Sequence, residues 1–333
     1  MISAVLSSTT LGINAYLVNI ETHFARVVPT SFIIVGLPDK AVKESSERVL
    51  AAVKNSGYTV PVRKITVNLA PADIKKEGSG FDLPIALGII CELGFIKPDI
   101  LKDYVFVGEL SLDGKLRPVR GILPIAIEVK RQNLKGLIVP EENAKEAAMV
   151  DGIDVHPLST LQEVIEFLNG SVGLEPFKVN IEEIFNTDEK NIVDFSDVKG
   201  QYEVKRALEI AAAGGHNIIM IGPPGSGKTM LAKRIPTILP PMTFDEALET
   251  TKIHSVAGML PSNTALVSTR PFRSPHHTIS DIALVGGGSI ARAGEISYAH
   301  HGVLFLDELP EFKKNVLEVM RQPMEESRVT ISR

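Results

Sequence analysis

Residues 222–229 read GPPGSGKT, a glycine-rich loop that ends in a lysine and a threonine. The apolar run NIIMIG (217–222) leads into the loop and predicts a strand, while MLAKRIP (230–236) follows it and predicts a helix. The spacing G-x-x-x-x-G-K-[ST] between a strand and a helix is typical of a loop that holds phosphate groups. This stretch therefore predicts an α/β nucleotide-binding domain in the second half of the chain.

The residue types of the loop suit a nucleoside triphosphate. Glycines let the backbone turn its N–H groups toward the phosphates without Cβ atoms in the way, and the start of a helix adds partial positive charge. We expect Lys228 to neutralise the β- and γ-phosphates and the hydroxyl of Thr229 to bind Mg²⁺. The predicted ATP-binding residues of the loop are Gly222, Pro223, Pro224, Gly225, Ser226, Gly227, Lys228, Thr229 and Met230.

A second motif, GVLFLDELPEF (302–312), supplies the carboxylates that such a site needs. Its run from Val303 to Leu306 predicts a buried strand. Asp307 at the end of this strand is expected to hold Mg²⁺, usually through water, and Glu308 to activate the water that attacks the γ-phosphate. Because an Asp–Glu pair follows the strand, the pattern favours an NTPase that hydrolyses ATP.

The interval between Lys228 and Asp307 is longer than a strand–helix–strand crossover needs and predicts an insertion. Within it lies RPFRSPHHTIS (270–280), which we place outside the hydrolytic site. Adjacent histidines on an extended segment point to opposite sides, so His276–His277 and His300–His301 are poor metal chelators without a special bend. No Cys/His cluster has zinc spacing, and we expect no structural zinc.

Several long stretches resemble the magnesium-chelatase-like branch of the AAA+ ATPases and, within it, the ComM/YifB family. They are RPFRSPHHTIS, GGGSIARAGEISYAHHGVLFLDELPEF, VLEVMRQPMEESRVTISR and DFSDVKGQ. Only ARAGE (291–295) departs, where relatives often have prolines. The resemblance implies an ATP-driven homo-hexamer acting on DNA, as in branch migration during transformation. It also implies that Val198 and Gln201 lie near the adenine, and that Arg270, Arg273 and the histidines contact DNA or a neighbouring protomer.

The first half of the chain predicts a separate α/β domain. INAYLVNIE (13–21) and KITVNL (64–69) have strand patterns, and helices are expected after LPD up to Gly57, over 81–94 and over 121–133. Residues 171–197 are acidic and predict a linker with one short helix, and a helix over 201–215 opens the second domain. We assign 1–170 to the first domain, 171–192 to the linker and 193–333 to the ATPase core.

KKEGSGFDLPIAL and GELSLDGKLRPVRGILPIAIEVKR resemble the proteolytic domain of Lon, which implies an α+β fold for residues 1–170. A Ser–Lys protease needs both groups of the dyad. The serine position falls on Gly80, with Ser79 one residue away, and the lysine position falls on Leu123. The resemblance therefore implies a non-proteolytic domain that docks partners or stabilises a ring.

Composition adds few constraints. The net charge of −5 gives no global basic field, so any DNA contact would come from a local patch. The single cysteine, Cys91, lies in an apolar run and is expected to be buried. A chain with one cysteine can form no internal disulfide, and we find no signal peptide or membrane-spanning segment in the sequence. The sequence therefore predicts a cytoplasmic protein with no membrane partner.

The chain ends shortly after Asp307, before any sensor or arginine finger can be placed. We expect a C-terminally incomplete AAA+ core with little ATPase activity of its own. Two alternatives to a DNA motor stay open at this point. One is the ATPase subunit of a metal chelatase, which is not expected to carry a Lon-like domain, and the other is a regulatory or chaperone-like ATPase whose partner is protein.

Overall fold

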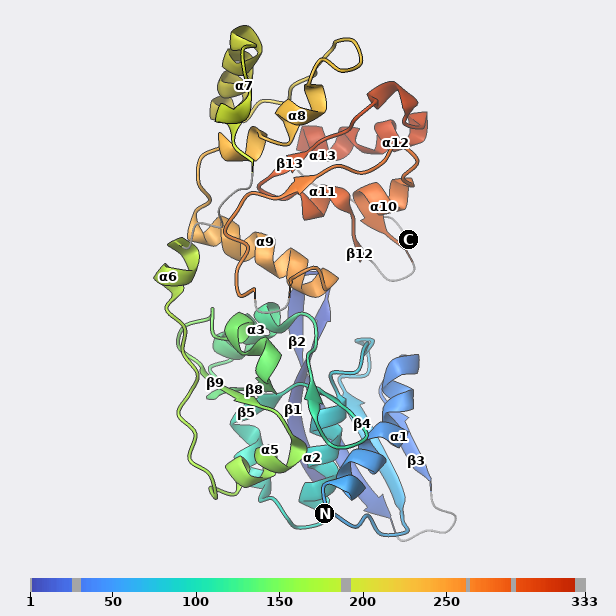
Figure 1. Ribbon diagram of the computed structural model, residues 1–333. Coiled ribbons are helices and arrows are strands. Elements are labelled where there is room, and N and C mark those ends of the chain that lie inside the picture. Colours follow the sequence, from blue (N-terminus) through green and yellow to red (C-terminus); the bar gives the residue numbers. More distant parts are fainter. Residues whose placement is uncertain (1, 26–30, 187–192, 262–263, 289–291, 327–333) are drawn as a thin grey trace. The chain divides into compact units, whose positions relative to one another are not determined.

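The computed structural model describes residues 2–25, 31–186, 193–261, 264–288 and 292–326. The chain divides into two compact units (Figure 1). Unit 1 comprises Met1–Asn180 with Gly258–Ala265, and unit 2 comprises Ile181–Ala257 with Leu266–Arg333. Unit 1 has one large hydrophobic core cluster, and the described part of unit 2 has two smaller ones. The domain boundaries at 170 and 193 stay a prediction.

Unit 1 is built on a seven-stranded mixed sheet of order β3-β4-β2-β1-β5-β8-β9. Strand β2 pairs antiparallel with both β1 and β4. Strand β3 pairs in parallel with β4 at one edge. On the other side of β1, the strands β5, β8 and β9 continue the sheet in parallel. Both strands expected from the sequence, within β2 and β4, are confirmed. The strands are β1 (Ile2–Leu11), β2 (Asn14–Ala25), β3 (Phe32–Val35), β4 (Lys64–Ala70), β5 (Tyr104–Phe106), β8 (Gly136–Pro140) and β9 (Asp154–Leu158), with a separate hairpin of β6 (Glu109–Leu110) and β7 (Leu116–Arg117).

The three helices expected in unit 1 are also confirmed, and α1 shows why. The side chain of Asp39 caps its first turn by accepting from the N–H of Val42 at 2.8 Å. The spacing of its apolar residues at three and four positions gives one buried face. The helices of unit 1 are α1 (Lys40–Asn55), α2 (Asp82–Glu92), η1 (Pro98–Lys102), α3 (Ile122–Arg131), η2 (Glu141–Asn143), α4 (Ala144–Ala147) and α5 (Leu161–Leu168).

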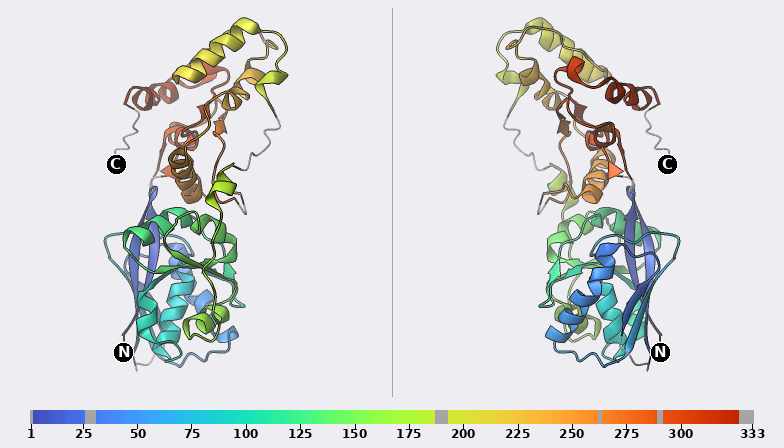
Figure 2. Two further views of the ribbon diagram at one scale, coloured as in Figure 1. Left: turned by 90° about the vertical axis from the view of Figure 1, so that its left-hand side faces the viewer. Right: turned by 90° about the vertical axis from the view of Figure 1, so that its right-hand side faces the viewer.

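Helix α2 forms the centre of the core of unit 1, between α1 and the strands β1 and β2 (Figure 2). Gly88 permits this close packing, because a Cβ there would lie 2.5 Å from Oγ1 of Thr22. The hydroxyl of Ser3 donates to the carbonyl of Gly88 at 2.9 Å. Cys91, on the same helix, is 7% exposed, and burial raises the pKa of its thiol. The expectation of a buried cysteine is confirmed.

A buried ion pair joins α1 to the start of α2. Asp82 is fully buried and accepts from Nε and Nη2 of Arg48 at 2.8 and 3.1 Å, and from the N–H of Leu110 at 3.2 Å. Burial raises the pKa of Asp82 to about 6, although Arg48 and the Leu110 N–H act in the opposite direction. The cost of burying the carboxylate thus offsets much of its attraction to Arg48, so the pair positions the two helices more than it stabilises them.

Unit 2 contains mostly short elements. The expected helix over 201–215 is confirmed as α7, and the short linker helix as α6; residues 187–192 of the predicted linker lie outside the described residues. The elements are α6 (Ile181–Asn186), η3 (Phe195–Asp197), α7 (Tyr202–Gly214), α8 (Lys228–Ala232), η4 (Ile235–Thr237), α9 (Phe244–Ala257), β10 (Phe272–Arg273), α10 (Asp281–Val285), β11 (Gly286–Gly287), β12 (Arg292–Ala293), α11 (Glu295–Tyr298), β13 (Val303–Leu304), η5 (Leu309–Glu311), α12 (Lys314–Val319) and α13 (Arg321–Glu326).

Two strand predictions in unit 2 need correction. Residues 217–222 form no strand, and Ile219 and Ile221 are 69% and 91% exposed. A strand persists only when a neighbour pairs with its N–H and C=O groups, and within the described residues no segment pairs with this one. The predicted buried strand from Val303 to Leu306 shortens to Val303–Leu304, which pairs in parallel with β10 and is only partly buried.

Among the helices that the structure describes, none combines the length and the apolar composition that crossing a membrane would require.

The Arg48–Asp82 pair generates a stability prediction. Asp82→Ala leaves Arg48 and the Leu110 N–H without their acceptor, so we expect unit 1 to lose about 3 kcal/mol of unfolding free energy. Hydrogen exchange of peptides that cover α2 measures this loss separately from unit 2. Glu44→Ala, which removes the exposed Lys40–Glu44 pair on α1, is the matched control and should cost less than about 0.5 kcal/mol. Equal protection of α2 in both variants would contradict the assignment.

Candidate active site

The loop 222–229 adopts backbone conformations that require glycine at two points. Gly225 and Gly227 have φ angles of +76° and +87°, in the left-handed region that L side chains rarely adopt. Gly227 directly precedes α8, which begins at Lys228 and ends at Ala232. The helix predicted over 230–236 therefore begins two residues earlier than expected and ends sooner, and the 3-10 turn η4 follows it.

The ammonium group of Lys228 is held inside the loop. Its Nζ donates to the carbonyl oxygens of Gly222 and Pro223 at 2.9 and 3.0 Å, and lies 3.5 Å from Oγ of Ser226. The cation thus lies within the ring of backbone that the sequence assigns to phosphates. An anionic oxygen that entered this ring would meet a strong charge-assisted donor.

Thr229 and Asp307 come together although they lie 78 positions apart in the chain. The Thr229 hydroxyl donates to Oδ2 of Asp307 at 2.8 Å, and Oδ1 of Asp307 accepts from the N–H of Glu308 at 3.1 Å. A hydroxyl and a carboxylate are the oxygen ligands that Mg²⁺ prefers, and Mg²⁺ completes its octahedron with water and substrate phosphates. The donor set therefore fits the expected metal.

Glu308 directly follows Asp307, and its side chain is largely exposed. Its φ of +53° lies in the left-handed region, and its side chain is 67% exposed. Oε2 of Glu308 lies 3.5 Å from Nδ1 of His277, whose ring packs edge-on against Phe312. His277 is thus a site residue that sequence reasoning missed.

The placement of RPFRSPHHTIS (270–280) outside the hydrolytic site is wrong. Within it, β10 pairs in parallel with β13, the strand that leads to Asp307, through Phe272–Val303 and Arg273–Leu304. From β10 the segment 270–280 continues to His277, which lies beside Glu308. Spacing along the chain holds no signal for this contact, because parallel pairing joins residues that are distant in sequence.

The two residues assigned to the adenine side differ in environment. The Val198 side chain is 1% exposed and belongs to a hydrophobic core cluster of unit 2, and its N–H and carbonyl are bonded to Phe195 and Lys205. Gln201 lies against the loop, where its Nε2 donates to the carbonyl of Ser226 at 3.3 Å. Arg234, just after α8, binds the segment 194–197, which precedes Val198. It donates to the Asp194 carbonyl at 2.9 Å and to the Asp197 carboxylate at 3.2 Å.

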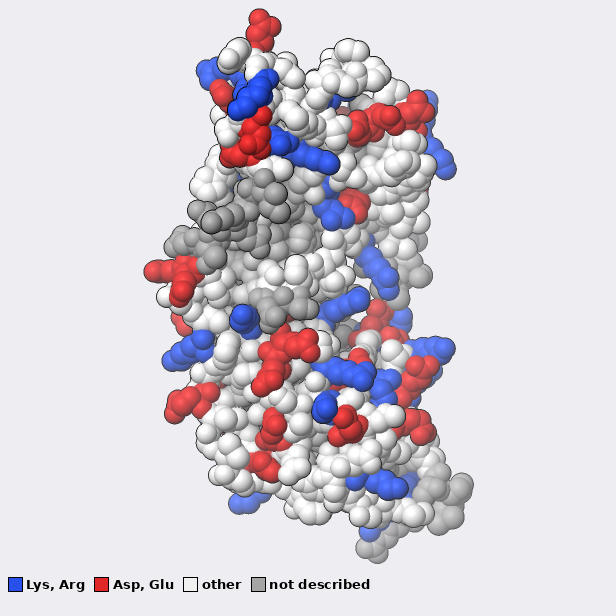
Figure 3. Space-filling view, viewed as in Figure 1, with Lys and Arg blue, Asp and Glu red and all other residues white. Residues whose placement is uncertain are grey.

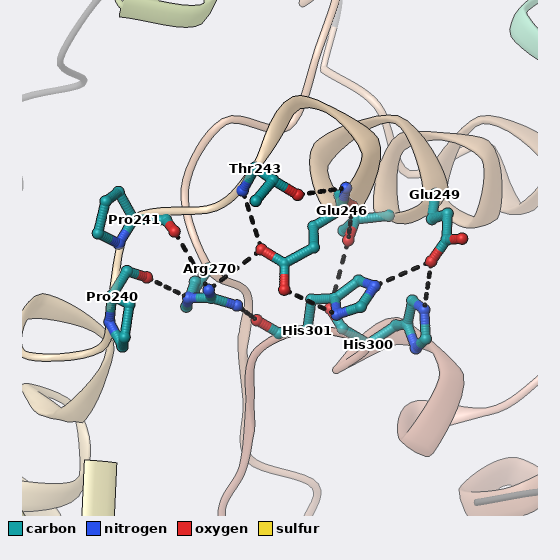
Figure 4. A network of polar contacts seen from close by, with 9 residues as sticks. Pro240, Pro241, Thr243, Glu246, Glu249, Arg270, His300 and His301 are labelled. Atoms are coloured by element: carbon teal, nitrogen blue, oxygen red, sulfur yellow. Dashed lines mark hydrogen bonds and ion pairs between the residues drawn. The ribbon is translucent and has the colours of Figure 1, made fainter. Parts of the chain in front are cut away.

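Arg270 and Arg273 make internal contacts within unit 2, and their expected contact with DNA or a neighbouring protomer stays a prediction. Nε and Nη1 of Arg270 donate to the carbonyls of Pro240 and His301 at 2.6 and 2.7 Å (Figure 4). Its Nη2 lies 3.2 Å from Glu246, whose pKa is lowered first by the N–H of Thr243 and then by Arg270. The guanidinium therefore ties the loop before α9 to the turn before β13.

Arg273 is also paired, through Nε and Nη2. It donates to both oxygens of Glu295 at 2.6 and 2.7 Å, in the bidentate geometry that gives strong ion pairs. Its guanidinium also lies 5.7 Å from the ring centroid of Tyr298. Both arginines thus hold unit 2 together, and neither presents a free fork to a partner in this conformation.

The Lon-like positions of unit 1 lack a proton-transfer pair. A Cβ at Gly80 would meet only Val119, and Leu123 is fully buried. Nearby polar groups are occupied separately, because Ser79 donates to Glu109 and the buried Lys76 donates to the carbonyl of Pro71. In the described part of unit 1, therefore, these side chains do not form a Ser–Lys dyad.

The chain matches two protein-family models. Residues 194–333 match the family described as magnesium chelatase, subunit ChlI, and residues 20–143 match a second model, subunit ChlI of Mg-chelatase. With the phosphate loop, the parallel strand pair and the Asp–Glu motif, these matches place the chain in the magnesium-chelatase-like class of AAA+ proteins.

Comparison with curated proteins narrows the class. The chain is 47% identical to competence protein ComM of Haemophilus influenzae over 334 residues, which is 100% of this chain and 65% of that protein. It is 44% identical to the uncharacterized protein YifB of Escherichia coli, covering 100% of this chain and 64% of that protein. The chain belongs to the ComM/YifB family. It spans about two thirds of the length of these relatives.

A weaker similarity covers the first half. Lon protease 2 of Bacillus subtilis is 29% identical over 142 residues, which is 42% of this chain and 25% of that protein. The similarity agrees with the Lon-like fold expected for unit 1.

The contacts of Lys228 generate a binding prediction. Lys228→Ala removes the cation from the loop, and we expect ATP affinity to fall by about a hundredfold or more, since hydrogen bonds to charged groups contribute about 1.5–3 kcal/mol each. Titration of the chain with a fluorescent ATP analogue and Mg²⁺ measures this change. Lys233→Ala, one turn further along and exposed, is the control and should leave affinity unchanged. Unaltered affinity in Lys228→Ala would overturn the loop assignment.

Proposed function

We propose that unit 2 binds ATP with Mg²⁺ and hydrolyses it. One observation carries the proposal: the hydrogen bond of 2.8 Å between Thr229 and Asp307, which brings the end of the glycine-rich loop to the segment that follows β13. These are the two places from which a P-loop NTPase coordinates its metal. ATP and Mg²⁺ use also agrees with the family match.

Each side chain of the site has a distinct role in this proposal. Lys228 transfers its hydrogen bonds from the loop carbonyls to the β- and γ-phosphates. Mg²⁺, held between Thr229 and Asp307, would neutralise phosphate charge. Glu308 takes a proton from the attacking water, whose oxygen bonds to the γ-phosphorus as the bond to the β-phosphate oxygen breaks, giving ADP and phosphate.

His277 acts in this scheme as a positioning residue. Its Nδ1 lies 3.5 Å from Oε2 of Glu308, and its edge contact with Phe312 fixes the ring. Glu308 is otherwise exposed and would sample many rotamers. A neighbouring imidazole therefore restricts the carboxylate to the side that faces the segment 270–280.

For the partner, we propose DNA and a ring of identical subunits, most often a hexamer in this class. The proposal rests on the resemblance of the sequence to the ComM/YifB family, and a relative that matches the whole chain is by its printed name a competence protein. Acidic and basic side chains are interspersed on the face drawn in Figure 3, so charge there does not select a polyanion by itself. Because Arg270 and Arg273 are engaged internally, Arg292, which is exposed on β12, is a better candidate contact.

Two other partners compete with DNA. The matched family descriptions support a metal-chelatase role. The Lon-like unit 1 counts against it, because a chelatase ATPase subunit is not expected to carry such a domain. A protein partner would give unit 1 a docking role. We propose that unit 1 is non-proteolytic, because Leu123 and Gly80 occupy the positions of the dyad.

The role of Glu308 generates a prediction for hydrolysis. With protein in excess over radiolabelled ATP, wild-type chain should convert bound ATP to ADP in a single turnover, and Glu308→Gln should convert it about a hundredfold or more slowly while binding it normally. Because only one turnover is followed, a slow chain can still be measured. The exposed Glu311→Gln on η5 is the control. Equal conversion by Glu308→Gln and wild type would reject Glu308 as the base.

The DNA proposal predicts a salt-dependent affinity. Fluorescence anisotropy with single-stranded and four-way-junction DNA should show binding in the presence of ATP that weakens as salt rises, because phosphate contacts release counterions. Arg292→Ala should reduce both the affinity and the salt dependence, whereas Arg206→Ala, which removes the exposed pair with Glu209, should not. Failure of both DNA substrates to bind at low salt would favour a protein or chelatase partner.

A further inference from the structure

Two adjacent histidines in the turn before β13 have their rings close together. The ring centroids of His300 and His301 are 4.0 Å apart. Neighbouring side chains on extended backbone point to opposite sides, and on that ground the sequence argues against a shared metal ion. His301 has a φ of +55°, in the left-handed region, so the backbone has the special bend that chelation requires. The sequence argument therefore fails for this pair.

Glu249 on α9 approaches both rings from the facing helix (Figure 4). Its Oε2 lies 3.3 Å from Nε2 of His300 and 2.9 Å from Nε2 of His301. These three side chains offer ligand atoms that all lie within 4.8 Å of one another. Ligand atoms about 2.0–2.1 Å from a tetrahedral Zn²⁺ are about 3.4 Å apart, so only a small adjustment would be needed.

The surroundings hold the two rings in place. Oε1 of Glu246, one turn before Glu249, lies 3.5 Å from Nδ1 of His301 and leaves Nε2 directed at Glu249. Metal-binding histidines commonly have a carboxylate on their second ring nitrogen, which orients the ring. The backbone is fixed as well, because Arg270 donates to the His301 carbonyl at 2.7 Å.

We propose that Glu249, His300 and His301 bind one divalent transition-metal ion. Two imidazole nitrogens and one carboxylate oxygen suit Zn²⁺ best among the common ions, and three protein ligands leave a position for water. The side chains of these residues are 62%, 42% and 25% exposed, so solvent and metal have access. This site differs in chemistry from the Thr229–Asp307 pair, whose oxygen atoms suit Mg²⁺.

The proposed metal has a mechanical consequence within unit 2. Glu249 belongs to α9, and the two histidines precede β13, the strand that leads to Asp307. A bound ion would therefore clamp α9 to the turn that leads through β13 to Asp307 and Glu308. It would stabilise unit 2 in the folded state by mass action.

The test is metal titration of the nucleotide-free chain. We expect one Zn²⁺ per chain by calorimetry, and visible absorption bands of tetrahedral Co²⁺ when Co²⁺ replaces it. His300→Ala and Glu249→Gln should each weaken binding about tenfold or more. His276→Ala is the matched control: His276 also stacks on an adjacent histidine, at 4.1 Å, but bonds to Thr278 and not to a carboxylate.

Circular dichroism should show that the variants fold. If His300→Ala unfolds, Glu249→Gln still tests the site, because it keeps the size of the side chain. Hydrogen exchange adds a second readout, because Zn²⁺ should protect α9 and the turn before β13 in wild type and in His276→Ala only. Absence of saturable Zn²⁺ or Co²⁺ binding would overturn the proposal. Unchanged affinity in folded Glu249→Gln and His300→Ala would do the same, since the metal would then bind elsewhere.

Discussion

The hydrogen bond from Thr229 to Asp307 is the contact on which the candidate active site depends. It joins two segments that are 78 positions apart, and it places the Thr229 hydroxyl next to the Asp307 carboxylate at the end of the glycine-rich loop. Lys228 lies on the loop side of this contact and Glu308 on the strand side. Without it, the loop and the acidic pair would be two motifs in one chain; with it, they form a donor set suited to a magnesium-bound triphosphate.

The insertion between these segments supports the same arrangement. It returns to the site as β10, which lies beside β13, and continues to His277 next to Glu308. Its arginines stabilise this return path, with Arg270 bound to carbonyls on both sides of α9 and Arg273 bound to Glu295. The conspicuous basic and histidine-rich composition of the segment thus reflects internal contacts first. Any external partner must be contacted by other residues or after these contacts rearrange.

Local patterns were sufficient for much of the fold. The helix expected after LPD is observed as α1, and its buried residues recur at three- and four-residue steps because helix periodicity decides which side chains share a face; they are Val42, Ser45, Val49, Ala52 and Val53. Local patterns failed at residues 217–222, where an apolar, β-branched run forms no strand. Strand formation depends on a neighbour that supplies the paired backbone groups, and no window of sequence around the run contains that information.

By itself, the sequence determined the family, the loop that suits phosphates and the carboxylates that suit magnesium, since these depend on residue type and short spacing. Tertiary structure alone decided which distant residues meet. It brought His277 to Glu308, engaged Arg270 and Arg273 internally, and bent the backbone at His301 so that two histidines face Glu249. The reason is physical: strand pairing and a single left-handed residue redirect side chains through space, and neither leaves a periodic signal in the chain.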